Sequence, residues 1–130
     1  EINLSNEKNN GLTVLKLIND KLVSSVHDIS SGGLLLAFAE MTFQSGYGIK
    51  INKPKNFSNS MEYYFSEDQG RYLIEIEPNN LNQINEILTK NNIFNEAIGM
   101  VQKDYFEVTG ELKIKTNELY NSNNTWYNNY

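Results

Sequence analysis

The stretch Val26-His27-Asp28-Ile29-Ser30-Ser31-Gly32-Gly33-Leu34 places two adjacent glycines between a short apolar run and a long one. Residues 23–26 are typical of a short strand, and residues 34–43 are apolar on most sides of a helix. The hydroxyls of Ser30 and Ser31 can cap the start of that helix. The stretch therefore predicts a strand, a tight turn and a helix that is buried on two sides.

The same junction carries the first candidate site. Gly32 and Gly33 let a ligand or another backbone approach closely, and free N–H groups at a helix start favour phosphate or carboxylate. Asp28 could bind a metal ion or a ligand hydroxyl. In the alternative interpretation Asp28 only satisfies the loop, and His27 is structural. No lysine follows the glycines as in a phosphate-binding loop, so a Walker motif is excluded.

A second polar segment, Ser66-Glu67-Asp68-Gln69-Gly70-Arg71, leads into an apolar run over 72–76. If it is extended, Glu67 and Gln69 share one side and Asp68 faces away. The four side chains Glu67, Asp68, Gln69 and Arg71 could converge on a polar ligand. A solvated turn with a weak local contact to Arg71 is the alternative.

The rest of the chain predicts an α+β domain. Alternation and helical spacing predict one mixed or antiparallel sheet with helices packed on it. We expect residues 1–10 to be a linker or frayed terminus and residues 11–130 to be the domain. Helices are expected over 12–22 (with Leu12, Leu15, Ile18 and Leu22 as the apolar face), 34–43 up to Gly46, 60–65, 78–88 and after a capping Thr116; strands over 23–26, 49–51, 72–76, 98–101, 105–108 and 112–114; and a loop over 53–60.

Composition excludes several classes of site. The 130 residues contain no cysteine, which excludes disulfides, thiolate metal sites and a cysteine nucleophile. One histidine excludes a two-histidine metal site within the chain. A net charge of −5 does not support binding to nucleic acid or to an anionic membrane. The longest apolar run, Leu34 to Ala39, is far below the ~20 residues of a membrane span. Because Glu1 is not an initiator methionine, we expect a piece of a longer protein.

Two motifs carry a family resemblance. Residues 26–34, followed by Ala37 and Ala39-Glu40-Met41, resemble the His-Asp-x-Ser-Asp/Glu-Gly-Gly-Leu motif of the AIR synthase-related C-terminal domain. Phe65-Ser66-Glu67-Asp68-Gln69-Gly70-Arg71-Tyr72 resembles that family's Phe-Ser/Gly-Glu-Ser/Asp-Gln-x-Arg-Phe/Tyr segment. The second motif and Trp126 are most similar to the synthetase subunit of phosphoribosylformylglycinamidine synthase. The His27-Asp28-Ile29-Ser30 form of the first motif, with Trp126, resembles its second, C-terminal copy of the domain. Ser31 departs from the family pattern, because the acidic residue is missing there.

The resemblance implies an ATP-dependent ligase of purine biosynthesis that converts formylglycinamide ribonucleotide to formylglycinamidine ribonucleotide. It implies ATP and Mg²⁺ in the full enzyme, none bound tightly to this chain, and no activity of the chain alone. Expected partners are a preceding nucleotide-binding-type domain and a glutamine amidotransferase, in the cytoplasm, and the isolated chain is expected to form a homodimer. The alternatives are a non-catalytic interface domain, or the same domain of aminoimidazole ribonucleotide synthetase or selenophosphate synthetase. No residue is expected to be catalytic or to bind metal; the ligand or interface candidates are His27, Asp28, Ser30, Ser31, Gly32, Gly33, Ser66, Glu67, Gln69 and Arg71.

Overall fold

Helices and strands alternate along most of the chain in the computed structural model, which describes residues 3–52 and 59–125. The predicted α+β class is confirmed. The elements, in chain order, are α1 (Leu4–Asn19), β1 (Ser25–Asp28), α2 (Gly33–Ser45), β2 (Tyr47–Ile51), α3 (Ser60–Phe65), β3 (Tyr72–Glu75), the 3₁₀ turn η1 (Pro78–Asn80), α4 (Leu81–Lys90), β4 (Gly99–Lys103), β5 (Tyr105–Val108), β6 (Leu112–Lys115) and α5 (Thr116–Thr125).

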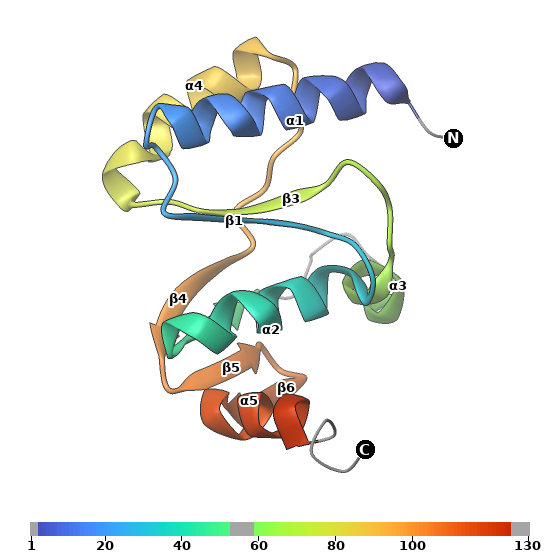
Figure 1. Cartoon of the computed structure of the whole chain (residues 1–130), viewed down its shortest axis with the longest axis vertical. Helices are drawn as coiled ribbons and strands as arrows, with labels where there is room; N and C mark the ends of the chain where they lie inside the picture. Colours follow the sequence, from blue (N-terminus) through green and yellow to red (C-terminus); the bar gives the residue numbers. More distant parts are fainter. Residues whose placement is uncertain (1–2, 53–58, 126–130) are drawn as a thin grey trace.

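The strands form two sheets, so the prediction of a single sheet is wrong. β1 and β3 make an antiparallel ribbon, and the other four strands lie in the order β4-β2-β5-β6, with β2 and β5 parallel. Figure 1 shows the ribbon between α1 and α4 on one side and α2 on the other. Leu73 belongs to one hydrophobic cluster and Ile74 packs against the other, so the ribbon packs against helices on both faces.

Two hydrophobic clusters follow from this layering. The smaller one joins α1 and α4, with Leu17, Leu22, Ile84 and Leu88 buried, and Ile74 of β3 packs against it. The larger one lies between the ribbon, α2 and the four-stranded sheet. Its buried residues are Ile29, Leu34, Ala37, Phe38, Ala39, Ile51, Tyr63, Tyr64, Leu73, Phe106 and Val108. The prediction that residues 34–43 are buried on two sides is consistent with this position of α2.

The first helix begins earlier than predicted. The expectation of a linker or frayed terminus is wrong for residues 4–10, which form the first turns of α1. Asn3 caps the helix by accepting a hydrogen bond from the Asn6 backbone at 3.1 Å. The Asn9 side chain donates to the Asn91 carbonyl at 2.8 Å. These amides hold a segment that has no apolar period, and the boundary of the domain itself stays a prediction.

The buried face of α1 is not the one that the apolar spacing predicts. Thr13 and Leu17 are buried in α1, whereas Leu12, Leu15 and Ile18 are 57%, 51% and 45% exposed. Both faces carry aliphatic side chains, and contact with α4 decides between them. Of the predicted face, only Leu22, after the helix, is buried as expected.

Smaller corrections concern the ends of elements. Gly46 adopts the left-handed conformation (φ 70°) at the end of α2, as predicted. Pro78 opens a 3₁₀ turn and α4 begins at Leu81. Most of the expected loop over 53–60, together with Trp126, lies outside the described residues. No helix in the described ranges is both long enough and apolar enough to cross a bilayer.

The face of the four-stranded sheet that carries Lys50 is polar. Glu107 of β5 lies 3.2 Å from the Lys50 amine on β2 and 3.3 Å from the Lys113 amine on β6. The three residues are direct neighbours in register. Hydrogen bonds from Lys50 and then Lys113 hold the pKa of the Glu107 carboxyl below its usual value. One carboxylate thus links three strands.

Candidate functional site

The two polar motifs meet at the start of α2. The Gly32 N–H donates a 2.8 Å hydrogen bond to Glu67 Oε1, across 35 residues of sequence. The Ile29 N–H donates to the Arg71 carbonyl at 3.0 Å, continuing the pairing of β1 with β3. Residues 26–34 and 65–72 therefore form one junction, which we call the glycine–glutamate junction.

The glycines of this junction are required by the backbone and by packing. Gly32 and Gly33 have φ of 80° and 67°, in the left-handed region. A Cβ added to Gly33 would lie 2.7 Å from the Phe65 carbonyl carbon. Gly32 is the N-cap residue of α2, and as a glycine it has no side chain that could cap the helix. The prediction that Ser30 or Ser31 supplies the cap is therefore wrong; the Glu67 carboxylate reaches the helix start from the other motif.

His27 connects β1 to α2. Its Nδ1 lies 2.6 Å from the Asp28 carbonyl oxygen, and its Nε2 lies 3.2 Å from Glu40 Oε2. Each ring nitrogen thus lies against an acceptor, and the tautomer decides which of the two contacts is a hydrogen bond. The half-buried ring thus fixes the strand to the helix, whereas the Asp28 carboxylate is exposed.

Arg71 is directed by the backbone of its own motif. Its Nη2 donates to the Ser66 carbonyl at 2.8 Å. Its Nε is buried and has no hydrogen-bond partner among the described residues. A buried guanidinium N–H without an acceptor is costly, which makes Arg71 a candidate for contact with a further group.

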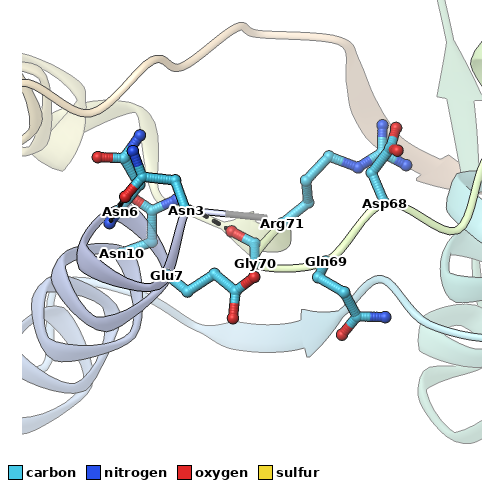
Figure 2. Close-up of a pocket in the computed structure, with 8 residues that line it drawn as sticks. All are labelled: Asn3, Asn6, Glu7, Asn10, Asp68, Gln69, Gly70 and Arg71. Carbon is cyan, nitrogen blue, oxygen red and sulfur yellow. Dashed lines mark hydrogen bonds between the residues drawn. The ribbon is translucent and has the colours of Figure 1, made fainter. Parts of the chain in front are cut away.

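An open polar pocket lies between the start of α1 and the second motif (Figure 2). Its volume is about 410 Å³, and amides, two carboxylates and one guanidinium line it: Asn3, Asn6, Glu7, Asn10, Asp68, Gln69, Gly70 and Arg71. The Asn10 side chain donates to the Gly70 carbonyl at 3.0 Å, which fixes the loop against the helix. Such a lining can recognise a polar ligand through several hydrogen bonds.

The pocket corrects the predicted arrangement of the second motif. Residues 67 and 68 lie outside β3 and residues 69–70 form a turn, so the alternation of a strand does not hold across this segment. Asp68 and Gln69 both line the pocket, while Glu67 turns toward α2. The α1 residues of the pocket were missed because residues 1–10 were read as a linker. The asparagines at positions 3, 6 and 10, spaced along one side of a helix, were the available signal.

The aromatic side chains of α3 have a structural role. Tyr63 and Tyr64 are buried, with ring centroids 5.2 Å apart in an edge-on arrangement, and burial raises the pKa of the Tyr63 hydroxyl. Among residues 3–52 and 59–125, no three His, Asp or Glu side chains are grouped so as to hold a metal ion.

Comparison with known proteins gives related sequences over the whole chain. The chain is 41% identical, over all of its 130 residues, to the phosphoribosylformylglycinamidine synthase subunit PurL of Pelagibacter ubique, and spans 18% of that protein. It is 39% identical to the PurL subunit of Bartonella bacilliformis, over 97% of the chain and 17% of the relative. The chain thus spans less than a fifth of the length of these relatives.

Solved structures share the fold. PurL of Thermotoga maritima complexed with FGAR superposes with a TM-score of 0.76 and 22% identity, covering 88% of this chain and 21% of that one. A chain of a HypE–HypF complex superposes with a TM-score of 0.58 at 17% identity, over 79% of this chain and 39% of that one.

The sequence profile of the AIR synthase related protein, C-terminal domain, matches residues 3–111. This range contains α1, both motifs and the glycine–glutamate junction. The resemblance predicted from the two motifs is confirmed, and the chain belongs to the AIR synthase related protein family, as a C-terminal domain of that family.

Proposed function

We propose that this chain is the C-terminal domain of an ATP-dependent ligase that converts formylglycinamide ribonucleotide to formylglycinamidine ribonucleotide, and that it acts only within the longer polypeptide. The observation that carries the proposal is 41% identity over the complete chain to a PurL subunit. In the proposed reaction, ATP activates the amide oxygen of the substrate and ammonia displaces phosphate. The second, C-terminal copy of the domain is our assignment, from the His27-Asp28-Ile29-Ser30 form of the first motif.

The residues of this chain have a binding and positioning role in the proposal. Gln69 and Arg71 contact a polar ligand at the pocket beside α1, and Arg71 Nε is a donor in need of an acceptor. Glu67 accepts a hydrogen bond from the Gly32 backbone. In the proposal, the remaining candidates form the wall of the same site or of a domain interface. The wall residues are His27, Asp28, Ser30, Ser31, Gly33 and Ser66.

Cofactors and partners belong to the full enzyme in this proposal. One PurL structure from Thermotoga maritima is complexed with ATP, and another is a PurLQS assembly. By analogy we propose ATP with Mg²⁺, a preceding nucleotide-binding-type domain, an ammonia-supplying amidotransferase and a cytoplasmic location. No residue of this chain is proposed as a ligand of the Mg²⁺. A homodimer of the isolated chain stays a prediction, to be checked by sedimentation.

Turnover of the long polypeptide tests the proposal. A purified polypeptide that contains this chain at the length of its relatives, supplied with ATP, Mg²⁺, ammonia and formylglycinamide ribonucleotide, should release ADP, phosphate and the amidine. The 130-residue chain alone should not. A stably folded long polypeptide without this turnover contradicts the proposal, and a screen with the substrates of aminoimidazole ribonucleotide synthetase and selenophosphate synthetase then separates the sister enzymes.

A scaffold role is the second candidate, because Glu67 and His27 already have partners within the domain. Asp28→Ala and Gln69→Ala distinguish the two readings, since neither side chain is needed for the contacts described above. If the long polypeptide keeps its fold, its turnover and its retained nucleotide in both variants, the domain is a scaffold. Loss of turnover at an unchanged melting temperature supports a ligand role.

A further inference from the structure

The outer face of α1 is an aliphatic stripe that belongs to neither hydrophobic cluster of the described residues. Leu4, Leu12, Leu15 and Ile18 are 74%, 57%, 51% and 45% exposed. At 100° per residue they lie within one broad side of the helix, opposite the buried Thr13 and Leu17. From Leu4 to Ile18 the stripe is about 21 Å long. In Figure 1, α1 lies at the end of the molecule farthest from the four-stranded sheet.

We propose that this stripe docks against another part of the same long polypeptide, outside the present 130 residues. This rests on the proposed function, in which the chain is one domain of a protein like its relatives. These relatives are long enough to supply such a partner, because the chain spans only 17–18% of their length.

The small apolar area of the stripe favours docking within one polypeptide over docking to a second copy of the chain. Four roughly half-exposed aliphatic side chains leave on the order of 200–300 Å² of apolar surface. A stable interface between free proteins buries about 800 Å² on each partner, of which about 450 Å² is apolar. A covalently linked neighbour needs much less, because its effective concentration is on the order of millimolar. A small stripe therefore fits a contact within one polypeptide.

The chemistry of the stripe specifies the docking segment. Lys8 is exposed and, by helical spacing, lies between Leu4 and the pair Leu12 and Leu15. The covering segment should therefore present aliphatic side chains, with a carboxylate opposite Lys8. Charged side chains are few elsewhere along the stripe. This is expected of a surface that becomes the buried centre of an interface.

Cysteine accessibility tests the proposal, because the chain contains no native cysteine. Leu15→Cys is prepared in the 130-residue chain and in the long polypeptide, and its reaction with a maleimide is followed by peptide mapping. Leu112→Cys is the control, since Leu112 is 43% exposed on β6, at the other end of the fold. We expect Leu15→Cys to react at least tenfold more slowly in the long polypeptide, with Leu112→Cys unchanged.

Three outcomes overturn the proposal. Leu15→Cys reacts equally fast in both proteins, or both cysteines are protected alike, or Leu15→Cys is protected in the 130-residue chain in a way that grows with concentration. The last outcome assigns the stripe to a second copy. Leu12→Cys replaces Leu15→Cys if the latter perturbs the circular dichroism spectrum. Turnover of the unmodified long polypeptide is measured separately, so that failure of the docking contact is distinguished from failure of the proposed function.

Discussion

At the scale of single residues, Gly33 lies where two distant segments pack closely together. Its φ of 67° is unfavourable for any side chain, and the position is also crowded by the Phe65 backbone. Gly46, with φ of 70°, has the same backbone conformation but open space where a Cβ would be. Substitutions at Gly33 and Gly46 therefore separate the free-energy cost of the backbone conformation from the cost of steric crowding.

We predict that Gly33→Ala lowers the free energy of unfolding by about 2–5 kcal/mol, because left-handed strain and overpacking add. Gly46→Ala is the matched control and should cost about 1–2 kcal/mol, from strain alone. Urea denaturation of both variants measures the difference. Equal losses would mean that α3 yields to the added methyl group and that the close approach is not needed.

Glu67 is the second informative residue, since its carboxylate accepts a hydrogen bond from the Gly32 N–H at the start of α2. Glu67→Ala removes both the hydrogen bond to Gly32 and a negative charge at the positive end of the helix, and should cost about 1 kcal/mol. Glu67→Gln keeps an acceptor and should recover most of that loss. Asp68→Ala, next to it and exposed, should change the unfolding free energy by less than about 0.5 kcal/mol. An effect of Asp68→Ala as large as that of Glu67→Ala contradicts this role.

At the scale of elements, α1 has apolar residues on two sides but one packed side. We predict that Leu17→Ala costs about 2–5 kcal/mol in the free energy of unfolding, because the side chain is fully buried against α4. Leu15→Ala, on the exposed stripe, should cost less than about 0.5 kcal/mol in the same chain. Thermal and urea denaturation check both values, and the reverse ranking would mean that α1 packs through the face that its spacing predicts.

The four-stranded sheet should have an acid-sensitive link at Glu107. Because the folded pKa of this carboxyl is lowered, its contribution to stability is present above the unfolded pKa and is lost as the pH falls through the folded pKa. Stability should therefore decrease on acidification, and less steeply in Glu107→Gln than in the parent. Urea midpoints between neutral pH and about pH 3 measure the two slopes. Glu86→Gln, on an exposed position of α4, is the control and should follow the parent.

At the scale of the whole molecule, local sequence predicted which residues form helices and strands better than which of these elements pack together. The helix after Gly33 and its end at Gly46 follow from glycine geometry and apolar periodicity, which are local. The division into two sheets and the choice of the buried face of α1 depend on which elements meet, and periodicity does not contain that information. The pocket is a similar case, because Asn10 reaches Gly70 from within α1, which extends back beyond its expected start at Leu12.

The candidate site was predictable in the residues of its two motifs, but not in their connections or in the α1 residues of the pocket. The two motifs identify Gly32 and Glu67, whereas the bond between them joins positions 35 residues apart. The serine cap was a reasonable local prediction that failed, since Gly32 takes the N-cap position and a carboxylate from another segment accepts from its N–H.

The ribbon of β1 and β3 has one more consequence. Leu73 belongs to the larger hydrophobic cluster, and its direct neighbour Ile74 packs against the smaller one. Since side chains alternate along a strand, inserting a single residue just before Leu73 would exchange their directions and offer each cluster the wrong side chain. The alignment of a four-residue strand with its partner thus sets the interior of both halves of the molecule at once.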